Sequence, residues 1–278
     1  MDGLDVLWHA SLPGLPLSER LDLAARAGFR GVSITAADLG AVSSDARRSI
    51  GDLSAVAGAS EVALTCLDSV IEWYPHETPR RMADAAVQDV DRLLDDCARL
   101  GVPSVSALAM FPSLCSFTDL VGHFAALCER AGERGLAVHL EFTPFPPIAG
   151  LREGWEVVRQ SDRANAGVLV DTWHFFHSGA DLELLAAIPG DRITAVQLSD
   201  GAPHLVESLL KDTFRHRLLP GEGSFDLQSV VDILRRRGGP RLVGPEVLSE
   251  ELLEAAADET VVRLAAAARR VCSPRPVE

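Results

Sequence analysis

The chain has 278 residues, of which 47% are hydrophobic and 5% aromatic, which is enough for one large α/β domain or two small ones. Its net charge of −14 argues against general nucleic-acid binding, which needs a basic surface. The chain has no uncharged apolar stretch of about 18 residues and no apolar leader, and its cysteines form no Cys-x-x-Cys pair. We therefore expect a cytoplasmic protein with reduced thiols and no membrane partner.

Short apolar runs alternate with segments of helical periodicity along the whole chain. The runs predict strands at residues 4–10, 31–35, 61–70, 104–110, 137–142, 167–173, 193–200 and 241–247. Each strand is followed by a predicted helix, at residues 17–28, 43–58, 78–101, 117–135, 151–160, 181–188, 225–239 and 250–272. Residues 201–224 form a loop long enough to indicate a functional segment.

This alternation predicts a closed (β/α)8 TIM barrel that forms a single domain over residues 1–278. Eight strand–helix units in about 250 residues is the usual size of such a barrel. The competing fold is an open doubly wound sheet. It is disfavoured because no Gly-x-Gly-x-x-Gly motif follows the first predicted strand.

Each of the last four predicted strands carries a residue near its carboxyl end that is able to bind a metal. These residues are Glu141, Asp171, Gln197 and Glu246. The carboxyl ends of barrel strands converge on one mouth, so the four side chains could meet around one ion. Oxygen donors suit Mn²⁺ or Mg²⁺ best, with Co²⁺ and Zn²⁺ as further candidates. Taken singly, a residue of this kind is most often a helix cap, a solvated loop residue or half of an ion pair, but four in consecutive units favour a shared site.

Other polar residues could contact a substrate at the same mouth. His174 lies three residues after Asp171 and could bind a substrate oxygen or move a proton, although packing among aromatic neighbours is the alternative. His9 ends the first predicted strand and could reach the mouth. Arg215 or Arg217 could bind a carboxylate, phosphate or hydroxyl group, and a surface ion pair is an equal alternative.

Aromatic residues near the strand ends predict an apolar mouth. They are Trp73, Phe142, Phe145, Trp173, Phe175 and Phe176. Among them Trp173 is expected to contact the substrate. This composition indicates either a bulky or sparsely hydroxylated substrate, or ordinary packing of loops.

Five motifs together resemble the xylose isomerase-like TIM-barrel superfamily. They are HLEFTPF (139–145), VDTWH (170–174), AVQLSDG (195–201), LPGEG (219–223) and the glutamate of VGPEV (243–247). This superfamily contains sugar phosphate isomerases and epimerases, inosose dehydratase, hydroxypyruvate isomerase and 3-dehydroshikimate dehydratase. The resemblance covers nearly the whole chain and is strongest from residue 137 onward.

The resemblance implies one divalent ion held by the same four strand-end residues. It also implies that Glu141 and Glu246 double as an acid–base pair, with His174 and Arg217 touching the substrate. Gln197 departs from the histidine usual in the sugar epimerases and is similar to the residue in dehydroshikimate dehydratase-like members.

The function expected first is a metal-dependent isomerase or epimerase of a sugar, sugar phosphate or related polyol ketone. The alternatives are a dehydratase of a cyclic hydroxyketone, such as 3-dehydroshikimate or an inosose, and a non-catalytic ligand-binding barrel. The sequence does not separate these reactions, because isomerisation, epimerisation and dehydration all begin by removing a proton next to a carbonyl. The expected partner is a small molecule, and the sequence leaves a homo-oligomer open.

Overall fold

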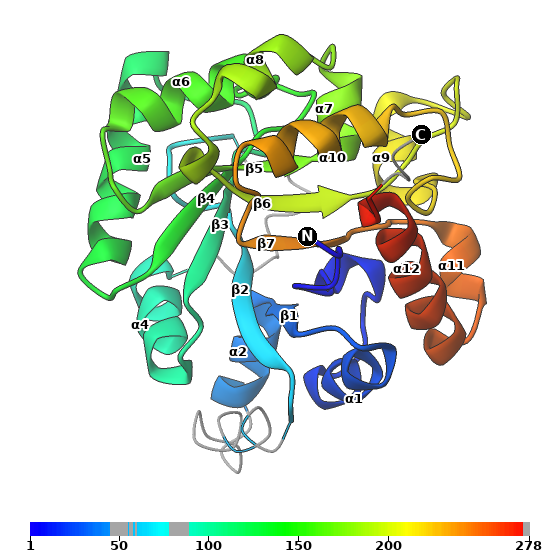
Figure 1. The fold of residues 1–278 in the computed structure, drawn as a ribbon. Helices are drawn as coiled ribbons and strands as arrows, with labels where there is room; N and C mark the ends of the chain where they lie inside the picture. The colour runs from blue at the N-terminus through cyan, green and yellow to red at the C-terminus, as the bar shows by residue number, and fades with distance from the viewer. Residues whose placement is uncertain (45–54, 56–57, 59, 78–88, 275–278) are drawn as a thin grey trace.

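A parallel sheet of seven strands, in sequential order, lies at the centre of the protein and is surrounded by helices (Figure 1). The computed structural model describes residues 1–44, 55, 58, 60–77 and 89–274. The strands are β1 (Gly31–Ile34), β2 (Ala63–Val70), β3 (Ser104–Leu108), β4 (Ala137–Glu141), β5 (Ala166–Asp171), β6 (Ile193–Leu198) and β7 (Leu242–Pro245). The strands are buried almost throughout, which explains their continuous apolar sequences.

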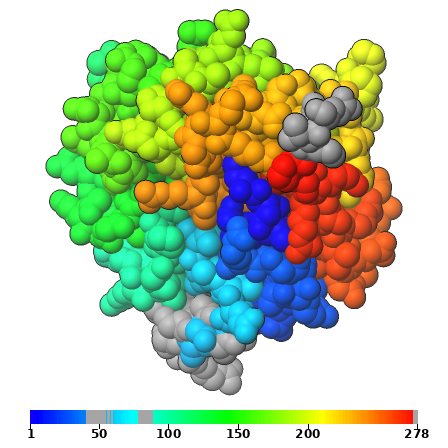
Figure 2. Space-filling model, in the orientation of Figure 1, coloured from blue at the N-terminus to red at the C-terminus, as the bar shows by residue number. Residues whose placement is uncertain are grey.

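The N-terminal segment Leu4–Leu7 connects the two edges of this sheet. Its Leu7 N–H donates to the carbonyl of Gly31 in β1 at 2.9 Å, and its Asp5 N–H donates to the carbonyl of Val243 in β7 at 3.0 Å. Figure 2 shows the N-terminal residues filling the centre of one face of the molecule, beside the C-terminal helix. Backbone hydrogen bonds through this segment therefore close the ring, as the predicted TIM barrel requires.

The strand predicted at residues 4–10 is wrong in its extent. Within it only Leu7 forms a β-bridge, with Val32. The chain turns directly afterwards into the 3₁₀-helix η1 (His9–Ser11), where the N–H of Ser11 bonds to the carbonyl of Trp8. The helical turn ends the extended backbone early and directs the chain toward the carboxyl ends of the strands.

Helices pack around the outside of the ring (Figure 1). Those of the described residues are α1 (Leu17–Ala27), α2 (Ala36–Ser44), α4 (Val90–Leu100), α5 (Phe117–Gly132), α6 (Leu151–Ser161), α7 (Thr172–His177), α8 (Leu182–Ala187), α9 (Leu209–Arg215), α10 (Leu227–Arg236), α11 (Glu250–Glu254) and α12 (Ala257–Cys272). A second 3₁₀-helix, η3 (Gly190–Arg192), precedes β6. Local signals set several ends: Ser116 caps α5, and left-handed Gly28 and Gly101 end α1 and α4.

Several predicted boundaries differ from the structure. The tail helix predicted at 250–272 is two helices, because Ala255 and Ala256 are extended. The loop predicted at 201–224 contains α9, and the strand predicted at 167–173 ends at Asp171, where α7 begins. Most of the helix predicted at 43–58, and the first part of that predicted at 78–101, lie outside the described residues.

The interior is apolar and includes buried cysteines. Cys97 and Cys128 are fully buried and belong to the main hydrophobic core. All five cysteines are free thiols. In the described part of the chain, no helix combines the length and the apolar character that crossing a bilayer requires.

Closure of the ring predicts that Gly244 in β7 tolerates no side chain. A Cβ placed there would lie 1.6 Å from the carbonyl oxygen of Val6, so Gly244→Ala should lower the free energy of unfolding by about 3 kcal/mol. Gly122→Ala in α5, where nothing lies within 4 Å, is the control and should raise it by about 0.5–1 kcal/mol. Urea unfolding measures both, and equal effects would contradict this account of closure.

Candidate metal centre

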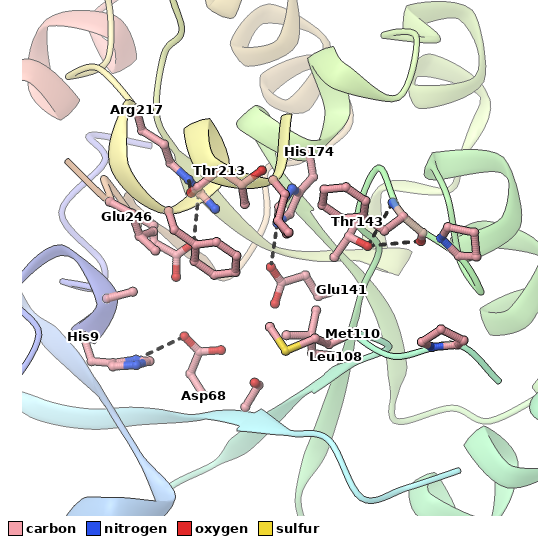
Figure 3. Close-up of a pocket in the computed structure, with 18 residues that line it drawn as sticks. His9, Asp68, Leu108, Met110, Glu141, Thr143, His174, Thr213, Arg217 and Glu246 are labelled. Carbon is pink, nitrogen blue, oxygen red and sulfur yellow. Dashed lines mark hydrogen bonds and ion pairs between the residues drawn. The ribbon is translucent and has the colours of Figure 1, made fainter. Parts of the chain in front are cut away.

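A cavity of about 630 Å³ lies at the carboxyl ends of the strands. Its volume is in the range usual for small-molecule sites. Figure 3 draws the side chains that line it. Most of the wall is apolar and is formed by Ala10, Leu108, Met110, Pro112, Phe145, Pro146, Leu210, Phe214 and Leu248. The charged groups that face the cavity therefore stand in a largely apolar space.

Glu141 is the last residue of β4 and points into this cavity (Figure 3). It is 5% exposed, and burial raises the pKa of its carboxyl well above the usual value, with the negative charges of Asp68 and Asp171 adding to the shift. Nε2 of His174 lies 3.7 Å from Oε1 of Glu141. No hydrogen bond to this carboxyl group exists within the described residues, so it is available to a bound molecule or ion.

Asp171 ends β5 and also caps the helix that follows. Its Oδ1 accepts hydrogen bonds from the backbone N–H of Trp173 at 2.7 Å and of His174 at 3.3 Å. Its Oδ2 accepts a hydrogen bond of 2.7 Å from Arg217. Burial alone would raise the pKa of Asp171, but Arg217 and the N–H donors lower it overall. The lowered pKa keeps Asp171 ionised near pH 7.

Gln197 and Glu246 come from the next two strands and contact each other. Gln197 pairs with Asp171 in the sheet register, and its Nε2 donates to Oε1 of Glu246 at 3.0 Å. Its other amide atom, Oε1, is buried and has no hydrogen-bond partner within the described residues. Burial raises the pKa of Glu246 well above the usual value despite the nearby Arg217.

Arg217 lies between two of these carboxylates. Its Nη1 is 2.7 Å from Oδ2 of Asp171 and 3.3 Å from Oε2 of Glu246. Burial lowers the pKa of the guanidinium, but the two carboxylates raise it overall, so it remains charged. Arg215 is half-exposed and pairs with Glu250 on the surface at 3.4 Å. Of the two arginines left open by the sequence, the structure brings Arg217 to the cavity.

His174 joins Glu141 and Asp171 in a compact group. One ligand atom from each lies within 4.8 Å of the others. Burial lowers the pKa of His174 to about 4, so its imidazole is neutral near pH 7 and its contacts with the two acids are not ion pairs. The sequence assigned His174 to substrate and acid–base chemistry, and its position also makes it a candidate metal ligand.

Trp173 does not line the cavity, contrary to the sequence-based expectation. The predicted strand ends two residues early, and the first turn of α7 directs this side chain behind the wall. There its Nε1 donates to Oγ1 of Thr213 at 3.1 Å, and its ring centroid lies 5.8 Å from the guanidinium carbon of Arg217. Trp173 thus contacts the cavity-lining Thr213 and Arg217 from behind the wall.

The structure places one of the other residues expected at the mouth, His9, in the cavity wall, but most of the expected aromatic residues lie elsewhere. His9 lines the cavity, but of the six aromatic residues expected there only Phe145 does. Sequence reasoning missed Asp68 of β2, which also lines the cavity and lies 3.3 Å from Nδ1 of His9. The signal was present, because Asp68 is a single acid inside an apolar strand sequence, as Glu141 is.

The family model described as xylose isomerase-like TIM barrel matches residues 21–268 of the chain. The 3-dehydroshikimate dehydratase of Pseudomonas aeruginosa is 31% identical over 217 residues, which are 76% of this chain and 33% of that protein. The inosose isomerase of Bacillus velezensis is 24% identical over 182 residues, which are 63% of this chain and 64% of that protein. The chain thus spans a third of the first relative's length and slightly less than two thirds of the second's.

Solved structures of low sequence identity share the fold. A crystal structure of the IOLI protein with a binding zinc atom has a TM-score of 0.82 at 19% identity, covering 96% of this chain and 97% of that one. D-Psicose 3-epimerase from Clostridium cellulolyticum H10, solved with D-tagatose, has a TM-score of 0.73 at 16% identity, covering 97% of this chain and 99% of that one. Both confirm the TIM-barrel fold.

The buried position of Arg217 predicts a large loss of stability on its removal. Arg217→Met leaves two buried carboxylates without opposite charge and should lower the free energy of unfolding of metal-free protein by about 3–5 kcal/mol at pH 8. Arg215→Met removes an exposed pair and should cost less than about 1 kcal/mol. Denaturant unfolding in EDTA measures both, and similar losses would show that Arg217 is not a buried counter-charge.

The raised pKa of Glu141 predicts a pH-dependent effect of Glu141→Gln. A carboxyl whose folded pKa lies above its unfolded value costs stability once the pH exceeds the unfolded value of about 4.5. Metal-free Glu141→Gln should therefore be more stable than the wild type at pH 8, and its advantage should shrink toward zero as the pH falls to about 5. The exposed Glu129→Gln is the control and should differ little at any pH. If the stability gained by Glu141→Gln instead grows as the pH falls, the pKa of Glu141 is not raised in the folded protein.

Proposed function

The chain belongs to the xylose isomerase-like TIM barrel family, and from this premise we propose that it is a divalent-metal-dependent isomerase or epimerase of a small ketone. Its reaction begins with removal of a proton from the carbon next to the carbonyl group. The observation that carries the proposal is a group of side-chain oxygens at the carboxyl ends of four consecutive strands. Glu141 and Glu246 line the apolar cavity, and Asp171 and Gln197 are fully buried beside them.

These residues fit a divalent cation. Oε1 of Gln197 is buried without a hydrogen-bond partner in the described part of the chain, which is costly unless something else binds it. Burial raises the pKa values of the carboxyl groups of Glu141 and Glu246. A cation nearby would lower these pKa values, because it stabilises the ionised form. A bound cation therefore satisfies the amide oxygen and offsets the negative charge.

The ligand atoms indicate which cations to expect. Three carboxylates and an amide oxygen favour Mn²⁺ or Mg²⁺, whereas the neutral imidazole of His174 in the same group also suits Zn²⁺ or Co²⁺. The zinc named for the IOLI protein is compatible with this second possibility. When bound, the metal would polarise the carbonyl group and stabilise the negative charge that develops on its oxygen.

The side chains of this protein supply the proton transfer and the orientation. Glu141 is the base, because its carboxyl group has no hydrogen bond among the described residues and faces the cavity. His174, neutral near pH 7, holds an oxygen of the substrate by a hydrogen bond. Arg217 fixes Asp171 and Glu246 in place by its two contacts.

The cavity favours an uncharged substrate. Among the described residues that line it, Arg217 is the one Lys or Arg, and two carboxylates already contact it. Leucine, methionine, proline and phenylalanine side chains form most of the remaining wall. A cyclic or short-chain ketone without a carboxylate or phosphate group matches this lining best.

Dehydration of a cyclic hydroxyketone is the second candidate. Gln197 is the amide ligand that the resemblance associates with dehydroshikimate dehydratase-like members, and a 3-dehydroshikimate dehydratase is 31% identical to this chain. Dehydration shares the first step, removal of the proton next to the carbonyl, and then loses a hydroxyl group as water. The carboxylate of 3-dehydroshikimate is the reason to rank this reaction second.

An exchange experiment in D₂O tests the first step. The protein is incubated with Mn²⁺ and, separately, an inosose, a ketohexose and 3-dehydroshikimate, and deuterium at the carbon next to the carbonyl is followed by NMR. We expect exchange and an isomeric product with the inosose or the ketohexose. An ultraviolet-absorbing conjugated product from 3-dehydroshikimate would instead identify the dehydratase.

Metal removal and substitution complete this test. EDTA and Glu246→Gln should each lower the exchange rate by at least about 100-fold, because both remove the stabilisation of charge on the carbonyl oxygen. Glu250→Gln, on the surface, is the control and should leave the rate unchanged. Exchange that survives both EDTA and Glu246→Gln would contradict the proposal. If the wild type binds a probe but catalyses no exchange, the protein is a ligand-binding barrel.

A further inference from the structure

A histidine–aspartate pair lies in the cavity away from the proposed metal ligands. Nδ1 of His9 is 3.3 Å from Oδ2 of Asp68, and Oδ1 of Asp68 accepts a hydrogen bond of 2.5 Å from Oγ of Ser106. Figure 3 shows His9 and Asp68 across the cavity from His174 and Arg217. Proton removal by Glu141 does not use this pair, so its presence in the cavity calls for another role.

The topology of the ring sets His9 and Glu141 on opposite sides. Glu141 ends β4, and His9 follows the segment Leu4–Leu7 that joins β7 to β1. Three strands separate that segment from β4 in one direction, β1 to β3, and three in the other, β5 to β7. A ketone bound between the two side chains would present one face to Glu141 and the other to His9.

The His9 ring is held so that one nitrogen remains available. The backbone N–H of His9 donates to Oγ of Ser33 at 2.8 Å, which fixes the start of η1. Nδ1 lies 3.3 Å from Oδ2 of the buried Asp68 and 3.5 Å from Oγ of Ser33, and no hydrogen bond to Nε2 exists within the described residues. The His9 side chain is 25% exposed and lines the cavity. A carboxylate on one ring nitrogen sets the tautomer and orients the other nitrogen for proton transfer.

Glu246 is less suited to a second proton transfer than the family resemblance implies. Its Oε1 accepts a hydrogen bond from Nε2 of Gln197 at 3.0 Å, and its Oε2 is 3.3 Å from Nη1 of Arg217. Both oxygens are therefore occupied by neighbouring donors. Glu141 is left as the acid–base group on the metal-ligand side, and a reaction with two proton transfers needs another group.

We propose that His9 is the second proton-transfer group of the cavity, positioned by Asp68 and Ser106, and that the reaction is an epimerisation. This inference rests on the proposed function and narrows it. Glu141 takes the proton from one face of the carbon next to the carbonyl, and the electron pair of the C–H bond moves to the carbonyl oxygen. The protonated His9 then gives its Nε2 proton to the opposite face of the same carbon, and the electron pair returns from the oxygen to form the new C–H bond. Proton exchange of both side chains with water restores the starting state.

Substitution of His9 separates the two transfers. With the inosose and the ketohexose as probes in D₂O and Mn²⁺, the wild type should form an epimer that carries deuterium at the inverted carbon. His9→Gln should lower epimer formation by about 100-fold or more. It should still place deuterium in the recovered probe, because Glu141 can remove and return a proton on its own face. His216→Gln, at a surface histidine that pairs with Glu207, is the control and should match the wild type.

A variant of the partner residue tests positioning. In ¹⁵N NMR of the metal-free wild type, His9 should carry its proton on Nδ1, and Asp68→Asn should shift the ring toward the Nε2-protonated tautomer. Asp68→Asn should also lower kcat for epimer formation by about 10-fold with KM changed by less than about twofold. An unchanged tautomer and an unchanged kcat would show that Asp68 does not position His9.

The outcomes distinguish this inference from the proposed function. Exchange by the wild type together with normal epimer formation by His9→Gln would overturn the role of His9 and leave the proposed function standing. Loss of exchange and product together in His9→Gln would also overturn it, because the residue would then be structural. No exchange by the wild type with either probe would overturn the proposed function and this inference with it.

Discussion

The fold holds Glu141, Asp171 and Glu246 out of water at one edge of the sheet, where Arg217 is the guanidinium that offers them opposite charge. Two of the three acids have raised pKa values, so without further positive charge they tend to keep their protons. A buried carboxyl group must be neutralised, paired or bound to a cation. This excess of buried acid is the physical reason to place a divalent ion here, and the choice of substrate and reaction follows from that ion.

Closure of the ring links the fold to this chemistry. The segment Leu4–Leu7 joins β7 to β1, so the residues that follow it and those that follow β7 meet in one cavity. Gly244 permits this contact, because any side chain at that position would meet the backbone of the segment. The same closure brings His9 to the side of the ring opposite Glu141, so titratable side chains face the cavity from two walls.

The sequence predicted the barrel, and it predicted that Glu141, Asp171, Gln197 and Glu246 lie at one edge of the sheet, because parallel strands end at one edge and a strand-end residue needs only its strand to be located. Their binding of a metal stays a prediction. It failed where side-chain direction depends on the first turn of a helix, as at Trp173, and where a short segment pairs without forming a regular strand, as at residues 4–10. It also missed Asp68, although an acid inside an apolar strand sequence was a local signal for the residue itself. The partners of Asp68, His9 and Ser106, come from distant parts of the chain. Contacts of that kind depend on the closed ring, and no local pattern encodes them.

The central claim is that oxygen atoms from β4 to β7 share one divalent ion. Anomalous diffraction from a crystal grown with Mn²⁺ tests it directly. The account predicts a single strong anomalous peak at about 2.0–2.3 Å from carboxylate oxygens of Glu141, Asp171 and Glu246 and from Oε1 of Gln197. A map without a peak among these side chains, with Oε1 of Gln197 hydrogen-bonded elsewhere, would contradict it.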